Sequence, residues 1–210
     1  MQLWSDSFKD GSAIPAKFAF CKIDTKAHVA LSDNKNPHLG WRDMPHDAQS
    51  LVLICHDSDA PSQGVDVNQL GREVPADLPR IDFFHWTLVD LPPGMLAIAE
   101  GEFCDGVLAR GKLGPEALRG TRQGINDYTG WFAADQDMLG EYYGYDGPCP
   151  PWNDSIVHHY TFTLYALDIP HLLVEGAFTA QQALAAMEGH ILAQASISGT
   201  YTLSPELQEK

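Results

Sequence analysis

The sequence has few basic residues and no long apolar run, and both absences argue against whole classes of function. Thirteen Lys and Arg residues stand against 28 Asp and Glu residues, which gives a formal charge of −15. A chain so acidic is repelled by nucleic acid and by anionic membrane surfaces. No run approaches the roughly 18 apolar residues of a membrane span, and the start MQLWSDSFKDG lacks a basic segment followed by an apolar one. We expect a cytoplasmic protein with no nucleic-acid partner and no integral membrane association.

Cysteine is scarce and scattered, which argues against a zinc site and against a dithiol redox site. The four cysteines stand far apart in the sequence, and no C-x-x-C pair occurs. Neither a zinc site nor a dithiol redox motif is therefore indicated. In a cytoplasmic chain we expect all four thiols to be reduced. They are Cys21, Cys55, Cys104 and Cys149.

What the sequence does contain is a series of short apolar runs separated by turn-forming clusters. With 210 residues and 44% hydrophobic side chains it can bury one substantial core, so we expect a single domain over residues 1–210. Apolar runs of strand length, most of them rich in aromatic and β-branched residues, indicate a mainly β fold. They predict strands at 51–55, 83–91, 158–168 and 196–203, with a tight turn at 56–61.

Helix signals are few, and the best lies near the C-terminus. Thr179 can cap a helix, and Gln182 stands three positions further on, as in a capping box. Leu184, Met187 and Ile191 then recur on one helical face. The segments 62–80 and 104–143 are rich in Gly, Pro, Asp and Asn and predict long surface loops, with a short helix around 115–118.

Two of the predicted strands begin close to a histidine. Alternation with period two places His158 and Tyr160 on the same face of their strand. By the same alternation, His85 shares a face with Phe83 and Thr87. The sequence therefore offers two imidazoles and a phenol that could line one pocket.

Carboxylates and prolines flank these strands. Asp57 and Asp59 could present both carboxylates to one cavity, with Pro61 stiffening the turn behind them, although they could equally cap and brace that turn. The segment 147–151, Gly-Pro-Cys-Pro-Pro, forms a rigid corner shortly before His158. Because prolines fix the backbone and remove donors, this corner is typical of a pocket wall.

These segments together resemble the signatures of a known family. Asp57-Ser58-Asp59-Ala60-Pro61, Phe84-His85-Trp86, Gly147-Pro148-Cys149-Pro150-Pro151 and His158-His159-Tyr160 are similar to motifs of the phosphatidylethanolamine-binding protein family, which includes the Raf kinase inhibitor proteins and many bacterial members. The resemblance runs from about residue 36 to residue 201. Several separated motifs in the right order are far more specific than any one alone.

The resemblance implies a fold, a site and a backbone feature. The fold would be a β-sandwich of two antiparallel sheets with Greek-key links, plus a few peripheral helices. The peptide bond between Ala60 and Pro61 would be cis. An anion-binding pocket would lie at one end, formed by Asp57, Asp59, Pro61, His85, Gly147, Pro151, His158 and Tyr160.

The sequence also departs from the family pattern. Ser58 stands where the family usually has proline, and His159 where it often has arginine. Additional residues around 129–143, and the stretch 64–79, could reshape the mouth of the pocket. The identity of the ligand is the least transferable property of the family.

Three kinds of function fit these observations. We favour a binding protein without enzymatic activity or cofactor, which recognises a small phosphate-like anion or a phosphoethanolamine headgroup and regulates a partner such as a kinase or protease. The alternative is a metal-dependent hydrolase in which the Asp/His cluster activates water, although no local metal-binding motif such as H-x-x-x-H is present. The third is a scaffold with a vestigial pocket, whose loops form a homodimer or a partner surface.

Overall fold

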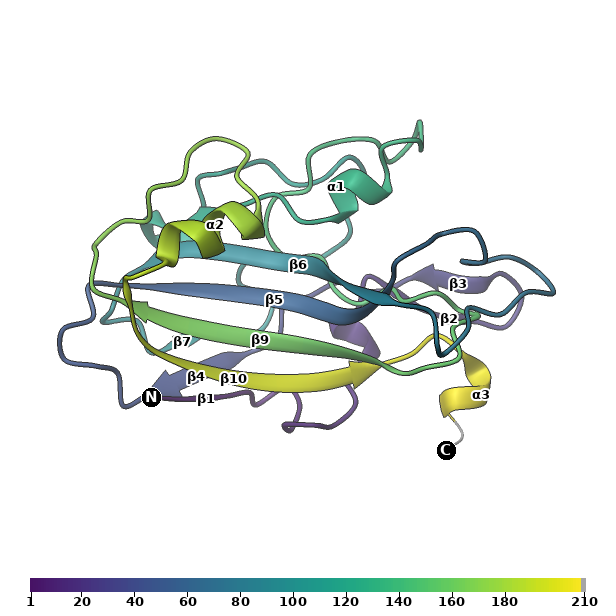
Figure 1. Ribbon diagram of the computed structural model, residues 1–210, viewed down its shortest axis with the longest axis horizontal. Helices are drawn as coiled ribbons and strands as arrows, with labels where there is room; N and C mark the ends of the chain where they lie inside the picture. Colours follow the sequence, from purple (N-terminus) through teal and green to yellow (C-terminus); the bar gives the residue numbers. More distant parts are fainter. Residues whose placement is uncertain (209–210) are drawn as a thin grey trace.

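The fold is organised around one antiparallel five-stranded sheet. The computed structural model, which describes residues 1–208, arranges this sheet in the order β10-β9-β5-β6-β8 (Figure 1). Its long central strands are rich in aromatic, aliphatic and β-branched residues, which favour extended backbone. The strands are β5 (Ser50–Pro61), β6 (Arg80–Leu91), β8 (Arg122–Gln123), β9 (His158–Leu167) and β10 (Ile191–Tyr201).

Two smaller sheets complete the β-structure. One has the order β1-β4-β7, and the other is the hairpin β2-β3. The hairpin lies at the end of the central sheet where β5 ends and β9 begins, at the right of Figure 1. A mainly β fold is thus confirmed, with three sheets in place of two. The strands are β1 (Gln2–Trp4), β2 (Cys21–Asp24), β3 (His28–Leu31), β4 (Leu39–Arg42) and β7 (Ala97–Ile98).

The helices are short and peripheral. The C-terminal helix α2 has the predicted capping box: Thr179 Oγ1 accepts from the backbone N–H of Gln182 at 3.3 Å, and Gln182 Oε1 accepts from that of Thr179 at 2.9 Å. In residues 1–208 no helix has both the length and the apolar character needed to cross a bilayer. The helices are η1 (Ala16–Phe18), η2 (Leu118–Gly120), α1 (Tyr128–Trp131), α2 (Ala180–Met187) and α3 (Pro205–Gln208).

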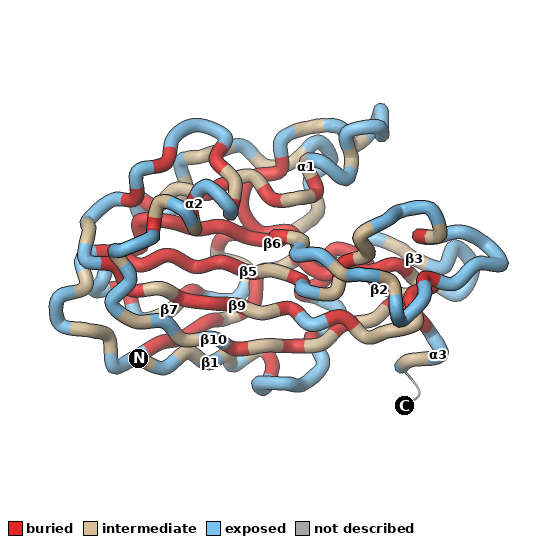
Figure 2. Tube along the Cα trace, in the orientation of Figure 1, coloured by how far each residue is buried: buried red, intermediate tan, exposed pale blue. Residues whose placement is uncertain are grey.

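The core lies on both faces of the central sheet. On one face, Trp41 and Trp86 are fully buried with aliphatic and aromatic side chains of β5 and β9. On the other face, Met187 of α2 shares a buried cluster with Val52 and Ile54 of β5. Figure 1 shows α2 lying against the sheet near β6. Figure 2 shows buried backbone along the middle of β5, β6 and β9. Each such large apolar side chain contributes about 1.5–3 kcal/mol by burial.

The structure corrects the expected turn after residue 55. β5 continues through Asp57 to Pro61, and β6 begins at Arg80 and pairs back onto it. An irregularity in the pairing between Asp57 and Ala60 accommodates the polar residues without ending the strand. The expected cis bond at Ala60-Pro61 is also wrong, because the cis peptide within residues 1–208 is Gly114-Pro115.

The cysteine prediction is wrong for two of the four residues. Cys21 at the start of β2 and Cys149 in the proline corner form a disulfide, with their Cα atoms 4.9 Å apart. Cys55 and Cys104 are free and buried. The pair is separated by 128 residues, so spacing along the chain could not reveal it.

Candidate functional site

A cavity of about 710 Å³ opens at the end of the central sheet next to the β2-β3 hairpin. In the antiparallel ladder Asp57 of β5 pairs with Phe83 of β6 on one side and with Tyr160 of β9 on the other. The end of β5 therefore meets the starts of its two neighbours, which brings their polar side chains together. Of the eight predicted site residues, six line the cavity: Asp57, Pro61, His85, Pro151, His158 and Tyr160.

An extra residue in β6 determines where His85 points. Cys55 pairs with Trp86 whereas the next residue of β5, His56, pairs with Phe84, so His85 is a bulge. The expectation from strict alternation, that Trp86 would face away from His85, is wrong. His85 packs with Phe83 and Tyr160 in the cavity, and Trp86 follows it into the core on the same face.

His158 lies between two buried carboxylates. Its Nδ1 is 2.7 Å from Asp57 Oδ2 and its Nε2 is 3.0 Å from Asp154 Oδ2. Burial alone would lower the pKa of His158, but the hydrogen bonds and charges of Asp154 and Asp57 outweigh burial and raise the pKa to about 9. The ring is therefore an imidazolium at neutral pH, and both of its N–H groups are already engaged.

Asp154 connects this cluster to a basic residue. Arg80 Nη1 donates to Asp154 Oδ2 at 2.6 Å and Arg80 Nη2 donates to Oδ1 at 3.0 Å. Burial raises the pKa of Asp154, but the bonds from His158 and Arg80 outweigh burial and lower it. The side chains of Asp57, His158, Asp154 and Arg80 thus form a chain of alternating charges with no net charge.

His85 is in the opposite protonation state. Its Nδ1 lies 2.8 Å from the backbone oxygen of Asp146. Because a carbonyl can only accept, Nδ1 carries the proton and Nε2 is left as an acceptor. Burial lowers the pKa of His85, and this effect exceeds the opposing charges of Asp57 and Asp146. The ring is therefore neutral at pH 7.

Tyr160 supplies a hydroxyl with no partner. It is 1% exposed, and its oxygen makes no hydrogen bond within residues 1–208. Burial raises the pKa of Tyr160 well above its usual value, and the neighbouring carboxylate of Asp57 raises it further, both by its charge and as a nearby acceptor, so the hydroxyl keeps its proton. A buried donor without a partner costs about 1–3 kcal/mol, which a ligand oxygen in the cavity can recover.

Two predicted site residues do not line the cavity. Asp59 points away from it, because the irregularity in β5 turns its carboxylate toward His159, whose backbone N–H and Nδ1 both lie 2.8 Å from Asp59 Oδ2. Gly147 lies behind the wall. Its N–H donates to Asn34 Oδ1 at 2.8 Å and its carbonyl accepts from Tyr128 Oη at 2.8 Å, so it has no donor left for an anion.

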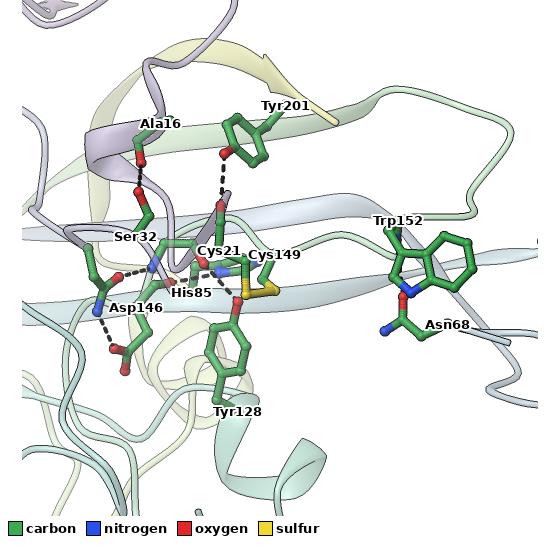
Figure 3. The surroundings of a disulfide bond; sticks show 12 residues. Ala16, Cys21, Ser32, Asn68, His85, Tyr128, Asp146, Cys149, Trp152 and Tyr201 are labelled. Carbon is green, nitrogen blue, oxygen red and sulfur yellow. Dashed lines mark hydrogen bonds between the residues drawn. A yellow bond between two sulfur atoms is a disulfide. The ribbon is translucent and has the colours of Figure 1, made fainter. Parts of the chain in front are cut away.

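The disulfide forms part of the cavity wall. Figure 3 shows it among its neighbours, where Tyr201 Oη donates to the carbonyl of Cys21 at 2.8 Å. The backbone N–H groups of Phe20 and Cys21 both donate to the carbonyl of Pro148. These contacts join the root of the β2-β3 hairpin to the proline corner. Both sulfur-bearing residues line the cavity.

Trp152 lies beside the β2-β3 hairpin. Its ring stacks on His28 with centroids 4.0 Å apart, and its backbone N–H donates to Asn68 Oδ1 at 3.0 Å (Figure 3). Trp152 is not among the residues that line the cavity. It instead holds the turn of the hairpin and the 62–79 loop against the corner.

Both segments that depart from the family pattern reach the cavity. The 129–143 segment contributes Trp131, Phe132 and Met138, and the 64–79 stretch contributes Val67 and Asn68. Their side chains make the outer part of the cavity largely apolar. The floor, in contrast, carries the polar atoms of β5, β6 and β9.

Sequence reasoning missed two carboxylates. Asp154, which sets the charge of His158, stands four residues before it, a spacing that carries no signal in an irregular segment. Asp146, whose carbonyl orients His85, lies near the proline corner. Its carboxylate accepts from Asn34 Nδ2 at 2.8 Å and from Lys112 Nζ at 2.9 Å, which fixes the backbone at that point.

The arrangement differs from that of a metal centre. Among residues 1–208, no three His, Cys, Asp or Glu side chains are placed to hold one metal ion. Before one of its ring nitrogens could bind a metal, His158 would have to lose the proton on that nitrogen and give up the contact with the carboxylate there. His85 Nε2 and the carboxylate of Asp57 are then the groups of the floor that could still bind a metal ion.

Comparison with known proteins assigns the family. A family model described as phosphatidylethanolamine-binding protein matches residues 4–202, so the chain belongs to this family. A relative from Methanothermobacter thermautotrophicus, named UPF0098 protein, is 33% identical and covers 96% of this chain and 98% of its own. Escherichia coli YbhB, also named UPF0098 protein, is 27% identical and covers 96% of this chain and 100% of its own.

Solved structures agree with this assignment. The crystal structure of a phosphatidylethanolamine-binding protein homologue from Chlamydia trachomatis has a TM-score of 0.64 and 30% identity, covering 95% of each chain. Escherichia coli YbcL, described as a member of the mammalian family, has a TM-score of 0.67 at 22% identity, covering 96% of this chain and 97% of its own. The second likeness supports the fold alone.

Proposed function

We propose that the protein binds a small phosphate-bearing ligand, either a phosphate monoester or a phospholipid headgroup, on the floor of the cavity and performs no catalysis on it. The observation that carries this proposal is the unpartnered Tyr160 hydroxyl beside an unprotonated ring nitrogen of His85 and the carboxylate of Asp57. One donor and two acceptors meet there. A ligand that offers an oxygen and a proton side by side satisfies all three.

The protonation states define the form of phosphate that fits. A phosphoryl oxygen can accept from Tyr160 Oη, while a P–OH or an ammonium group donates to His85 Nε2 or Asp57. A fully deprotonated phosphate would place its charge against the carboxylate with no imidazolium N–H free to compensate, because those of His158 are engaged. The floor therefore selects the protonated or the zwitterionic form.

The pH dependence of binding then follows from the ligand and not from the histidines. The pKa of His158 is about 9, so the ring stays protonated over this range, but both of its N–H groups are already bound to carboxylates. The pKa of His85 is lowered, so that ring is neutral. The second pKa of a phosphate monoester is about 6. We expect tighter binding at pH 6 than at pH 8, because the ligand, not the protein, loses the required proton.

Binding is favoured over metal-dependent hydrolysis for a structural reason. A hydrolase needs a metal held by several ligands or an activated water, and the floor offers only His85 Nε2 and the carboxylate of Asp57, which is already paired with His158. Regulation of a kinase or protease, and homodimer formation, stay predictions from the sequence.

The location of the protein is proposed on the basis of the disulfide. Disulfides persist in oxidising compartments and are rare in the cytosol. The bond between Cys21 and Cys149 therefore favours an oxidising compartment over the cytoplasm expected from the sequence. Alkylation of free thiols in denaturant at the moment of cell lysis, followed by mass spectrometry, tests this point: two alkylated cysteines support it and four contradict it.

Calorimetry with inorganic phosphate and with phosphoethanolamine tests the proposed function. We expect binding by the wild type, with at least a tenfold loss in Tyr160→Phe and in His85→Phe, because each removes one polar partner. His159→Ala is the matched control, since His159 pairs with Asp59 outside the cavity. Absence of binding to either ligand at pH 6, or equal affinity in all variants, would refute the proposal.

An assay of phosphoester hydrolysis distinguishes the binding protein from the alternative, a metal-dependent hydrolase. After addition of zinc, manganese or magnesium we expect no turnover of a generic phosphomonoester. Metal-dependent turnover that His85→Phe abolishes would establish the hydrolase instead.

A further inference from the structure

One part of the cavity wall comes from the loop between β5 and β6 and has no regular structure. Residues 66–72 of this loop, here called the outer arm, form neither helix nor strand, and five of the seven are exposed. Val67 is buried, and both Val67 and Asn68 line the cavity. Because an exposed segment has little apolar packing to hold it, the position of the outer arm depends on its polar contacts.

A single side chain makes most of these contacts. Asn153 Nδ2 donates to the carbonyl of Asp66 at 2.8 Å and to that of Arg72 at 3.0 Å, and the carbonyl of Gln69 lies 3.4 Å away. Asn153 Oδ1 accepts from the backbone N–H of Asn68 at 2.9 Å. The amide thus joins both ends of the outer arm and two points between them.

The amide of Asn153 is directed entirely at the outer arm. A carboxamide has two N–H donors and one acceptor oxygen, and all three groups bond to backbone of the arm. Asn153 is 9% exposed, and among residues 1–208 it is not one of those that line the cavity. The side chain is therefore placed to hold the arm and not to touch a ligand.

The rest of the loop is fixed without this amide. The backbone N–H of Val74 donates to the backbone carbonyl of Asn153 at 3.0 Å. Arg80 Nη2 donates to the carbonyl of Pro75 at 2.9 Å. Removal of the Asn153 side chain leaves both of these contacts in place, so residues 74–79 should keep their position.

One other contact reaches the outer arm from the proline corner. The backbone N–H of Trp152 donates to Asn68 Oδ1 at 3.0 Å (Figure 3). Within residues 1–208 no further hydrogen bond joins the arm to groups outside its loop. This bond is exposed, so water can replace it, whereas the amide of Asn153 is buried. Loss of that amide should therefore release the arm.

From these contacts we infer that Asn153 is a positioning residue, which keeps Val67 and the outer arm against the cavity and so makes the site selective for the organic group of a phosphate ester. The inference rests on the proposed function, because it takes the phosphate to lie on the floor. An inorganic phosphate fills only a small part of a cavity of about 710 Å³, so its ester group must extend along the walls. The arm then contacts the ester group and not the phosphate.

Calorimetry at pH 6 with inorganic phosphate and with naphthyl phosphate tests this selection. We expect wild-type protein to bind naphthyl phosphate more tightly, because the ring buries apolar surface against the walls. Asn153→Ala should weaken naphthyl phosphate by about tenfold, mainly through faster dissociation, and inorganic phosphate by less than about twofold. A merely structural role of Asn153 would weaken both ligands alike.

A second substitution tests whether Asn153 acts through the arm. Val67→Ala shortens the wall but keeps every contact of Asn153, so it also tests the selection if Asn153→Ala does not fold. We expect it to weaken naphthyl phosphate and not inorganic phosphate. The double variant should bind naphthyl phosphate no more weakly than Asn153→Ala alone, because the arm is already released. Fully additive losses, or no effect of Val67→Ala, would overturn the inference.

A matched control lies within the arm itself. Arg72→Gln breaks the pair of Arg72 with Asp66, whose side chains are 55% and 33% exposed, but keeps the Arg72 carbonyl for Asn153. We expect this variant to bind both ligands as the wild type does. Amide hydrogen exchange should be faster in residues 66–72 of Asn153→Ala and unchanged in Arg72→Gln. Equal exchange of the arm in wild type and Asn153→Ala would refute the hold on the arm.

The remaining outcomes distinguish this inference from the proposed function. If inorganic phosphate binds but naphthyl phosphate binds no more tightly, or if Asn153→Ala weakens both alike, the selection by the outer arm is wrong and phosphate binding stands. If neither ligand binds wild-type protein, the proposed function itself fails and the selection falls with it.

Discussion

The two ends of the central sheet are stabilised by different interactions. At the cavity end, buried charges alternate from Asp57 through His158 and Asp154 to Arg80. At the other end, α2 packs Met187 and its apolar neighbours onto the sheet. Burying charge is more demanding than burying hydrocarbon, because each charge requires partners. The cavity end is therefore built around a network of paired buried charges, whereas the α2 end is covered largely by apolar packing.

The largest expected effect comes from breaking the charge chain. Asp154→Ala leaves Arg80 and His158 without their shared carboxylate, and we expect the free energy of unfolding to fall by about 3–5 kcal/mol in urea titrations at pH 7. Asp59→Ala is the control, because its partner His159 is 57% exposed and Asp59 itself 22%, so loss of this solvent-screened pair should cost less than about 1 kcal/mol. Similar losses in the two variants would contradict the buried network.

The same network of buried charges predicts that Asp57→Asn lowers the stability of the protein. The turn predicted at 56–61 would make this substitution harmless to the fold. Asp57 instead is buried within β5 and lies 2.7 Å from the imidazolium of His158. The amide removes a negative charge from that contact, so loss of stability will accompany any change in ligand binding.

A substitution at the α2 end should destabilise by packing alone. Met187 is fully buried, and Met187→Ala should lower the free energy of unfolding by about 2–5 kcal/mol through lost burial and a residual cavity. We expect this loss to be the same at pH 6 and pH 9 and phosphate affinity to be unchanged, since no titrating group is affected. A pH-dependent loss would show that the two ends are coupled.

The cavity end should instead respond to pH. The pKa of His158 is raised from its usual value near 6.5 to about 9 in the folded protein. Its stabilising effect is therefore complete below pH 6.5 and is lost as pH rises through 9, a change of up to about 3 kcal/mol. Urea titrations across this range measure it. His158→Gln should remove this pH dependence, and an unchanged slope in that variant would contradict the assignment.

The smallest effect is expected at the helix cap of α2. Thr179→Ala removes the side-chain acceptor for the N–H of Gln182, and we expect a loss of about 1 kcal/mol. Thr179→Ser keeps the hydroxyl and should lose much less. Both can be measured as shifts in the thermal midpoint, and equal shifts would mean that the capping bond is unimportant.

Local patterns in the sequence predicted much of the fold. Aromatic and β-branched runs located β6 and β9, and the spacing of Thr179 and Gln182 located the start of α2. These features depend on neighbours in the sequence. The bulge at His85 does not, because it arises where β6 must match β5, and period-two alternation cannot reveal an extra residue.

The sequence predicted which residues form most of the candidate site, but it did not predict their protonation states or contacts. The family motifs identified His85 and His158, but their opposite charge states follow from contacts with Asp146 and Asp154 that only the fold creates. For the same reason, spacing alone could not distinguish the two aspartates of the 57–61 motif. The irregularity in β5 separates them, so that Asp57 faces the cavity and Asp59 faces His159.

The pairing of Cys21 with Cys149 also has a consequence for how the chain must mature. Two further thiols are present, and any of them could form a wrong bond while the chain is unfolded. In the folded protein, burial raises the pKa of Cys55 well above its usual value and that of Cys104 to about 11, so neither forms the thiolate that attacks a disulfide. If both thiols are buried before oxidation, Cys21 and Cys149 are the two left to react, and the finished fold prevents their bond from rearranging.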